Sequence, residues 1–223
     1  MSKTLKVNEI FRSLQGEGLY QGEPTVFVRT QGCNLRCPWC DTQYARNPDG
    51  GKVLRIEDII KEVVSKQKEG WVCITGGEPL MQDEAVGELV GILWEEGYKV
   101  EIETNGFYPL PYWHSRVHSW ALDVKCPSSG KSPLPAIVET WEELTSSSLQ
   151  VKFVVKVPRD LNFVLEVKNK KLFNGKMFII SPVFIKGKLD NGWGQTVAQF
   201  CLDNNFRLSL QYHKILWGDK RGV

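Results

Sequence analysis

Residues 25–40 read TVFVRTQGCNLRCPWC, a β-branched run that leads directly into three cysteines. The run over 25–30 has the composition of a buried β-strand. Cys33, Cys37 and Cys40 follow it with the spacing C-x3-C-x2-C. Thiolates are soft ligands suited to iron–sulfur clusters, zinc or copper(I), so the stretch predicts a metal-binding loop at the end of a strand.

Outward from this loop, short β-branched or aromatic runs alternate with segments of helical spacing. The other expected strands cover 71–75, 99–103, 120–125, 150–157, 177–180 and 207–212, and the expected helices cover 56–64, 83–96, 139–145, 161–168 and 195–204. This alternation implies an α/β fold of parallel units with right-handed crossovers. Either an open doubly wound sheet or a curved, partly closed barrel satisfies it. In both, ligands bind where the carboxyl ends of strands meet the following loops.

Composition is that of a soluble globular protein, with 42% hydrophobic and 24% charged residues. At 223 residues the chain fits a single domain, residues 1–223. A formal net charge of +2 gives no reason to expect a nucleic-acid binder. The sequence has no apolar run long enough to span a membrane, and its first residues lack the apolar core of a signal peptide, so we expect a cytoplasmic protein.

Six cysteines in such a chain favour metal or redox chemistry over disulfides. Cys73 in a strand and Cys201 in a helix are expected core residues, whereas Cys126 follows a strand end and is harder to assign. Three close thiolates without an evident fourth suit a [4Fe–4S] cluster with one open iron. The alternative is a zinc site completed by a histidine, although His114 and His118 flank no second cysteine pair.

Further polar motifs stand at the ends of other expected strands. They are Gly76-Gly77-Glu78-Pro79, Glu103-Thr104-Asn105-Gly106 and Asp123-Val124-Lys125. The two adjacent glycines let the backbone approach a ligand closely, and the Glu78 carboxylate can accept from an ammonium group. Taken one at a time, each motif is equally an ordinary turn or a surface ion pair.

The cysteine spacing after a first strand, with the aromatic Trp39 before the last cysteine, resembles the radical S-adenosylmethionine (SAM) superfamily. The resemblance implies a partial (β/α)6 TIM-like barrel and a [4Fe–4S] cluster on Cys33, Cys37 and Cys40. It also implies that the open iron binds the amino and carboxylate groups of SAM, which one electron cleaves to a 5′-deoxyadenosyl radical. The residues it assigns to the SAM site are Trp39, Gly76, Gly77, Glu78, Glu103, Thr104, Asp123, Val124, Lys125 and Ser181.

The flanking motifs narrow the resemblance. Leu14–Gly18 (LQGEG), Arg29, Asp41-Thr42 and the end of the chain from Gln211 resemble the 7-carboxy-7-deazaguanine synthase family, from about residue 7 onward. This implies contraction of 6-carboxy-5,6,7,8-tetrahydropterin to 7-carboxy-7-deazaguanine with loss of ammonia, in queuosine-type 7-deazapurine biosynthesis. SAM would act catalytically, with Mg2+ beside the substrate carboxylate. The family further implies a homodimer and an external one-electron donor such as flavodoxin.

Each role implied by the family makes chemical sense. Besides the cysteines, Arg29 is the implied catalytic residue. Its planar guanidinium can bind the substrate carboxylate through two parallel hydrogen bonds. The Thr42 hydroxyl is a hard ligand for Mg2+, and Asp41 would orient a metal-bound water. Leu14–Gly16 would bind a purine-like edge through backbone groups and the Gln15 amide. The residues implied to contact substrate are Leu14, Gln15, Gly16, Glu17, Arg29, Thr75, Gln211 and His213. Gln211 and His213 are expected at the end of the final strand, and His213 is alternatively a dimer contact.

The chain departs from the family pattern in two loops. It has Asp123-Val124-Lys125 where many members read Ser-Pro-Lys, and Ser181-Pro182 where Gln-Pro is common, so individual SAM contacts there stay open. Two alternatives to the family reaction remain. A glycyl-radical activase shares the cysteine and GGEP motifs but needs neither a pterin-sized pocket nor Mg2+. A non-catalytic iron–sulfur or zinc module would need only the cysteines.

Overall fold

The computed structural model describes residues 3–130, 138–145 and 148–223. Its strands are β1 (Thr4–Leu14), β2 (Pro24–Thr30), β3 (Lys52–Arg55), β4 (Trp71–Gly76), β5 (Lys99–Thr104), β6 (Ser119–Asp123), β7 (Leu149–Val155), β8 (Met177–Pro182) and β9 (Arg207–Leu208). They form one sheet in the order β3-β1-β2-β4-β5-β6-β7-β8-β9. From β2 to β9 all neighbours run parallel, whereas β1 is antiparallel to both β2 and β3.

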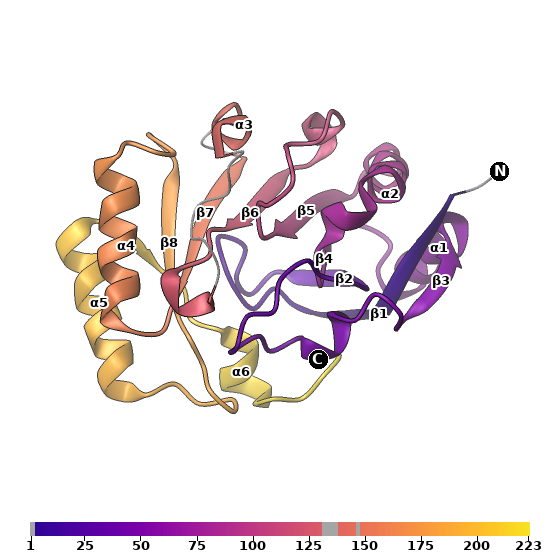
Figure 1. The fold of residues 1–223 in the computed structure, drawn as a ribbon. Helices are drawn as coiled ribbons and strands as arrows, with labels where there is room; N and C mark the ends of the chain where they lie inside the picture. The colour runs from indigo at the N-terminus through magenta and orange to yellow at the C-terminus, as the bar shows by residue number, and fades with distance from the viewer. Residues whose placement is uncertain (1–2, 131–137, 146–147) are drawn as a thin grey trace.

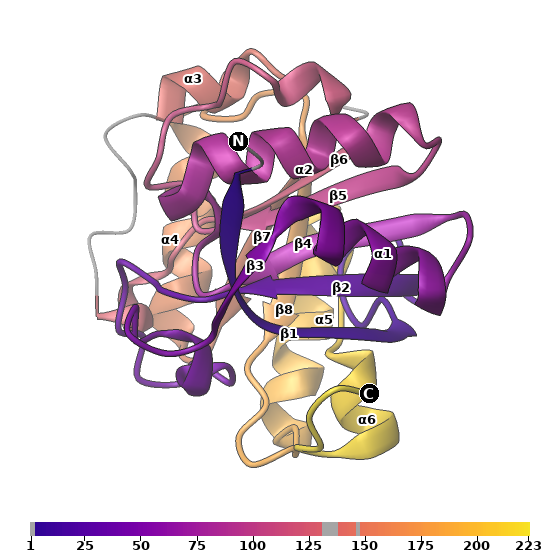
Figure 2. The same ribbon diagram turned by 90° about the vertical axis from the view of Figure 1, so that its right-hand side faces the viewer.

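The helices are α1 (Ile56–Lys66), α2 (Asp83–Glu95), α3 (Val138–Glu142), α4 (Pro158–Asn169), α5 (Asn191–Asn204) and α6 (Tyr212–Trp217). Figures 1 and 2 show a curled sheet with α1, α2, α4 and α5 on its convex side. The predicted apolar face holds α1 there, because Ile56, Ile59 and Val63 are buried. An open doubly wound sheet would carry such helices on both faces. The prediction of a partial α/β barrel is therefore confirmed.

The parallel units are incomplete between β5 and β6. Residues 105–118 contain only a 3-10 turn, His114–Arg116. Three indoles cover the outer face of β6 instead, since Trp113 and Trp141 pack on Trp120 with ring centroids 5.7 Å and 5.3 Å away. Trp120 is completely buried. These side chains take the place that a crossover helix would occupy.

Two strands, β1 and β3, fall outside the expected set. Leu5 and Val7 are the buried residues of β1, and the rest of that strand is partly or fully exposed. β3 is exposed along most of its length. Neither segment therefore carries the continuous apolar run or the strict alternation that marks a strand in sequence. Both form because the antiparallel ladders that β1 makes with β2 and β3 supply the pairing.

The expected strand over 207–212 is wrong beyond Leu208, where β9 ends. The Tyr212 N–H donates to the Gly16 carbonyl (2.8 Å) instead of extending the ladder with β8. The chain turns there into α6, so Gln211 precedes the first turn of this helix and His213 lies within it. Their predicted place at a strand end is thus corrected.

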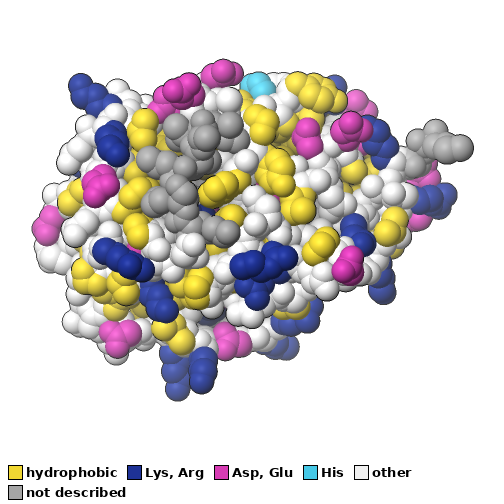
Figure 3. Space-filling model, in the orientation of Figure 1, with side chains coloured by type: hydrophobic (Ala, Val, Ile, Leu, Met, Phe, Trp, Pro, Cys, Tyr) yellow, Lys and Arg dark blue, Asp and Glu magenta, His cyan; other side chains and the backbone are white. Residues whose placement is uncertain are grey.

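Positive, negative and apolar side chains mix over the face shown in Figure 3, without a continuous field of one sign. This agrees with the small net charge of +2. Within the residues described, every helix is too short or too polar to cross a bilayer.

We expect Trp120→Leu to lower the free energy of unfolding by about 2–4 kcal/mol, because it leaves a cavity among buried indoles. Trp94→Leu is the matched control, since Trp94 is 49% exposed on α2; its effect should stay below about 0.5 kcal/mol. Anaerobic urea denaturation of both variants measures the difference. Equal losses would mean that the indole cluster does not carry this part of the core.

Candidate active site

The carboxyl ends of the parallel strands surround a cavity of about 670 Å³. Most residues predicted for the site line it: Leu14, Gln15, Gly16, Glu17, Arg29, Cys33, Cys37, Trp39, Cys40, Thr42, Thr75, Gly76, Gly77, Glu103, Thr104, Asp123, Lys125, Gln211 and His213. Glu78, Val124 and Ser181 lie behind this lining and are buried. Because the carboxyl ends of the parallel strands meet at one edge of the sheet, segments far apart in sequence come together at the cavity.

The three predicted thiols come from one irregular loop after β2. The Cys40 N–H donates to the Cys37 carbonyl (3.2 Å), and buried Leu35 anchors the loop while its N–H faces Cys33 Sγ at 3.4 Å. Burial raises the pKa of Cys33 and Cys37, against the lowering effect of the Lys125 ammonium. Thiols in such surroundings ionise readily only when a metal centre binds them.

The other cysteines do not reach this loop. Cys73 lies inside the barrel, Cys126 Sγ faces a backbone carbonyl at 3.9 Å, and Cys201 is buried in α5. Neither they nor His114 and His118 line the cavity. All the cysteines are free thiols. Within the described lining, Cys33, Cys37 and Cys40 are the only cysteines, which favours a cluster with one open iron.

The GGEP motif packs against the base of the cysteine loop. A Cβ on Gly77 would lie 2.0 Å from the Gly32 carbonyl oxygen, to which the Glu78 N–H donates (2.8 Å). The Glu78 carboxylate accepts from Thr104 Oγ1 (2.7 Å) and the Asn105 N–H (2.8 Å). Burial raises its pKa, against these hydrogen bonds. Glu78 thus fastens the end of β4 to that of β5, and its acceptance from an ammonium group stays a prediction.

Asp123 ends β6 with a free acceptor. Its Oδ2 pairs with Lys125 Nζ at 2.5 Å, and that ammonium also lies over the Trp39 ring, 5.8 Å from its centroid. Asp123 Oδ1 is buried and finds no hydrogen-bond donor among the residues described, and Ser181 Oγ likewise has no partner there. An unpaired buried acceptor is costly. Asp123 Oδ1, in the cavity wall, therefore fits a ligand that donates there.

Residues 15–23, between β1 and β2, are called the plug loop because they close the amino end of the barrel. The Gly18 N–H donates to Ser209 Oγ (2.9 Å), beyond β9. The Leu19 N–H donates to Gln150 Oε1 (3.0 Å), at the start of β7. The loop therefore joins both sides of the partial barrel across its interior.

Both glycines of the QGEG motif are required by close contacts in the plug loop. A Cβ on Gly16 would lie 2.1 Å from His213 Nδ1. Gly18 has a φ of +75°, and a Cβ on it would lie 2.5 Å from Gln150 Oε1. Gly16 thereby seats the His213 imidazole beside the cavity.

Gln15 is committed to the protein itself. Its N–H and carbonyl pair with Glu23 O and Gly22 N, both at 2.8 Å. Its amide Nε2 donates to Glu101 Oε2 (2.5 Å) and Glu103 Oε1 (3.3 Å). The Gln15 amide thus orients two carboxyl groups inside the barrel, and recognition of a purine-like edge by residues 14–16 stays a prediction.

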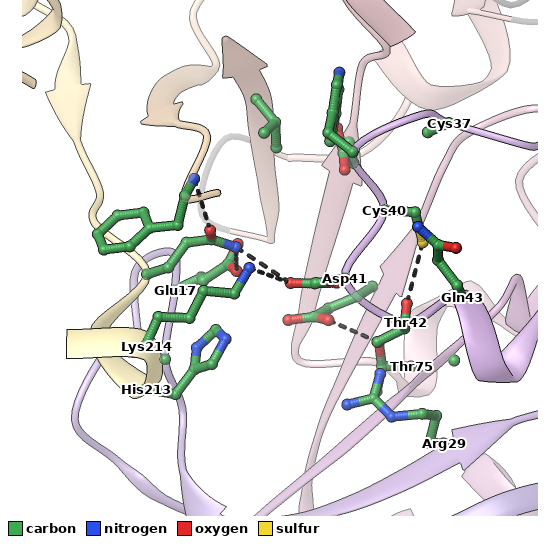
Figure 4. A pocket seen from close by; sticks show the side chains of 18 of the residues that line it. Glu17, Arg29, Cys37, Cys40, Asp41, Thr42, Gln43, Thr75, His213 and Lys214 are labelled. Carbon is green, nitrogen blue, oxygen red and sulfur yellow. Dashed lines mark hydrogen bonds and ion pairs between the residues drawn. The ribbon is translucent and has the colours of Figure 1, made fainter. Parts of the chain in front are cut away.

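Figure 4 shows two polar walls facing each other across the cavity. One wall carries Glu17 and His213, and the other carries Arg29 and Thr42. Thr42 Oγ1 lies 3.5 Å from Cys40 Sγ. A ligand between these walls meets the cysteine loop on one flank and charged side chains on both faces.

Two carboxylates on these walls are held ionised by buried lysines. Glu17 pairs with Lys152 and accepts from Gln211 Nε2 (2.8 Å). Asp41 pairs with Lys214 Nζ at 2.9 Å. Burial raises the pKa of Glu17, but Lys152, His213 and the hydrogen bond from Gln211 together outweigh it and bring the pKa to about 2. Burial is likewise outweighed at Asp41, where Lys214 lowers the pKa. The cavity thus presents fixed negative charges.

Known proteins similar to this chain were found by sequence and by structure. Residues 27–119 match the Radical SAM superfamily model. The 7-carboxy-7-deazaguanine synthase of Methanospirillum hungatei is 39% identical, over 96% of this chain and 86% of that protein. The chain belongs to the 7-carboxy-7-deazaguanine synthase family. The Koribacter versatilis enzyme of this name is 38% identical over 96% and 97% of the two chains. The crystal structure of QueE from Escherichia coli aligns with a TM-score of 0.74 at 25% identity, over 94% and 95% of the chains.

Radical SAM enzymes carry a [4Fe–4S] cluster and SAM, and the residues present fit both. Cys33, Cys37 and Cys40 supply three thiolates from one loop in the lining. The unpaired Asp123 oxygen offers an acceptor to a SAM amino or hydroxyl group. The predictions of superfamily, family and both cofactors are thereby confirmed.

Sequence reasoning missed three polar residues of the barrel interior, Glu101, Gln150 and Lys152. Glu101 accepts from Gln15 Nε2 and from Gln150 Nε2 (2.7 Å), and Lys152 pairs with Glu17. A signal was present, because Glu101 and Glu103, like Gln150 and Lys152, stand two residues apart in otherwise apolar strands. Polar residues at period two mark the inward face of a barrel.

The carboxyl group of Glu101 is strongly affected by its burial in this interior. Burial and the neighbouring Glu103 raise the pKa of Glu101 to about 8, against the hydrogen bonds from Gln15, Ser119 and Gln150. The carboxyl of an unfolded chain ionises near 4.5. Between these values the folded state binds one proton more than the unfolded state, so this group lowers the stability as pH rises from about 5 to 8.

We therefore expect Glu101→Gln, which cannot ionise, to gain thermal stability relative to the unmodified protein as pH rises from 5 to 8.5, by about 3 °C or more. Scanning fluorimetry across this range measures the difference in melting temperature. Glu95→Gln, on the exposed surface of α2, is the control and should give a nearly constant difference. If the difference in melting temperature between Glu101→Gln and the unmodified protein did not change with pH, the extra proton on Glu101 in the folded state would be refuted.

Proposed function

We propose that this chain converts 6-carboxy-5,6,7,8-tetrahydropterin into 7-carboxy-7-deazaguanine with release of ammonia, in queuosine-type 7-deazapurine biosynthesis. The observation that carries the proposal is a single cavity where the three-thiol loop stands beside Arg29 and Thr42. Relatives named for this activity support it. A cavity of about 670 Å³ suits a bicyclic pterin beside a cofactor better than the polypeptide of a glycyl-radical activase.

Arg29 and Thr42 are proposed to hold the carboxylate end of the substrate. The Arg29 guanidinium offers two N–H groups to the carboxylate, a bidentate match. The Thr42 hydroxyl is proposed as a ligand of Mg2+, with substrate and water oxygens completing the coordination. Asp41, fixed by Lys214, would orient a metal-bound water.

The aminopyrimidine part of the pterin is proposed to meet the polar floor of the cavity. Thr75 Oγ1 donates to Glu103 Oε2 (2.7 Å), which places Glu103, assigned by resemblance to SAM, beside a predicted substrate residue. A carboxylate matches the adjacent N–H groups of an aminopyrimidine edge. Glu17 and Gln211, joined by a hydrogen bond of 2.8 Å, would complete this contact with His213 beside them.

When bound, the cluster and SAM supply the radical chemistry of the reaction. The chain's own residues bind and orient the substrate and fix the charges around it. Lys152 keeps Glu17 ionised and Lys214 keeps Asp41 ionised, so neither carboxylate competes for protons of the substrate. The plug loop excludes water from the amino end of the barrel.

The wider context belongs to the proposal as well. We propose one domain over residues 1–223, a cytoplasmic location, a homodimer, and an external one-electron donor such as flavodoxin. Free cysteines throughout the described chain support a reducing compartment. Ile215 and Leu216 on α6 are 52% and 49% exposed and offer an apolar surface to a second copy.

The iron-reconstituted protein with dithionite, SAM, Mg2+ and 6-carboxytetrahydropterin should form 7-carboxy-7-deazaguanine under anaerobic conditions, with SAM regenerated. Product and SAM are followed by liquid chromatography and mass spectrometry. Cys37→Ala, which removes a proposed cluster ligand, is the negative control. Stoichiometric loss of SAM without the deazaguanine acid would exclude the proposed reaction.

Thr42→Ala should weaken Mg2+ activation by about tenfold or more, because one inner ligand is lost, while cluster absorbance is unchanged. Rates measured against Mg2+ concentration give the half-saturation value. Thr196→Ala, in α5 and outside the cavity lining, is the matched control. If Thr42→Ala lost the cluster absorbance instead, the role of this loop residue would lie in cluster binding.

A further inference from the structure

Glu9 stands opposite Arg29 in the regular antiparallel register of β1 and β2, which runs without a break from the pair Leu14–Pro24 to this pair. The ladder becomes irregular only beyond Glu9, towards Val7. Residues directly opposite each other on neighbouring strands project from the same face of the sheet. This pairing brings the Glu9 carboxylate to the Arg29 side chain, which lines the cavity.

The Glu9 carboxylate contacts three polar side chains. Its Oε1 accepts from Arg29 Nε (2.9 Å) and from the Tyr44 hydroxyl (2.9 Å). Its Oε2 lies 3.6 Å from Arg221 Nη2, and the Arg221 guanidinium stacks on the Tyr44 ring with Cζ 3.4 Å from the centroid. The Glu9 and Arg29 side chains are only 18% and 14% exposed, so solvent screens their ion pair little.

Arg29 is held on its Nε side and open at its other edge. Its Cζ lies 5.7 Å from the Phe11 ring centroid and 6.0 Å from that of Tyr44, so two aromatic rings confine the guanidinium. Nε is engaged by Glu9. Within the described chain, neither Nη atom donates a hydrogen bond to a protein group. The edge that remains free is the one that binds a carboxylate bidentately.

We propose that Glu9 is a positioning residue that aims the free edge of Arg29 at the substrate carboxylate. The inference rests on the proposed function, since it takes Arg29 as the carboxylate ligand. Without Glu9 the guanidinium could rotate about its long side chain and present its Nε edge or a single N–H. The negative charge of Glu9 also offsets the positive charge of Arg29. Glu9 therefore favours substrate binding by orienting the guanidinium and not by strengthening its attraction for the carboxylate.

The same carboxylate connects two parts of the site. Tyr44 belongs to the short turn Gln43–Ala45, directly after Thr42. Because Glu9 accepts from both Tyr44 and Arg29, it fixes the arginine relative to the loop that carries the proposed Mg2+ ligand. A carboxylate bound by Arg29 is thereby kept in register with Thr42.

The test compares the dissociation constants of 6-carboxytetrahydropterin and its neutral 6-carboxamide analogue. Both are titrated calorimetrically into reconstituted, SAM-bound protein at fixed Mg2+. Glu9→Ala should reduce the preference for the carboxylate about tenfold or more, since bidentate geometry is lost, while carboxamide affinity changes by less than about threefold. Glu9→Gln should lose less, because its amide oxygen still accepts from Nε. Glu62→Ala, an exposed glutamate of α1, should leave the preference unchanged.

A double-mutant cycle separates positioning from a merely structural role. In an Arg29→Lys background, which has no guanidinium to aim, Glu9→Gln should change the preference by less than about twofold. Melting temperatures of every variant are recorded beside the titrations. If Glu9→Ala does not fold, the Glu9→Gln cycle alone decides the question.

Three results would overturn the inference. The first is that the Glu9 variants bind both ligands more weakly by equal factors, and the second is that they keep the full preference. The third is that the preference falls equally whether or not the Arg29→Lys substitution is present. Each of these leaves the proposed function standing, because the unmodified protein still prefers the carboxylate. If the unmodified protein binds neither pterin, the proposed function itself fails and this inference with it.

Discussion

The approach of the Gly77 backbone to Gly32 is the constraint on which the site depends. No side chain fits between them, because a Cβ on Gly77 would lie 2.0 Å from the Gly32 oxygen. The Glu78 N–H bonds that same oxygen, and the Glu78 carboxylate ties β4 to β5. Since Cys33 directly follows Gly32, the cysteine loop is fixed against the strand ends that carry the residues predicted to bind SAM. The thiols and these strand-end residues are therefore held in a fixed arrangement.

A second constraint follows from filling a barrel with charge. Buried ions are tolerated only when they are paired and hydrogen-bonded. Lys152 is paired with Glu17, whereas Glu101, whose raised pKa of about 8 keeps it protonated at neutral pH, is hydrogen-bonded by Gln15 and Gln150. Two of these partners, Glu17 and Gln15, come from the plug loop, so the loop closes the barrel by supplying the groups that its polar interior requires. Such costly interiors are retained where a ligand needs fixed charges around it.

The predictable parts of this structure are those that local sequence determines. The parallel strands and their helices carry apolar runs and helical spacing, and the motifs at their ends are contiguous in sequence. By contrast, β1 and α6 depend on partners elsewhere in the chain. The Tyr212 N–H bonds Gly16, almost two hundred residues away, and this contact ends the last strand. No periodicity near Tyr212 reports on it. The interior polar residues Glu101 and Lys152 did leave a period-two signal, but it is read only once the strand is known to face a lumen.

Arg29 shows where a motif stops being informative. Its position in the sequence is that of any strand arginine, and the family resemblance alone implies a role for it. What holds its guanidinium is the cross-strand pairing with Glu9, which sets that carboxylate at Nε and leaves the other edge open. A shift of this ladder by one residue would turn Glu9 to the opposite face of the sheet. The proposed preference for a carboxylate therefore depends on the register of two strands as much as on the identity of the arginine.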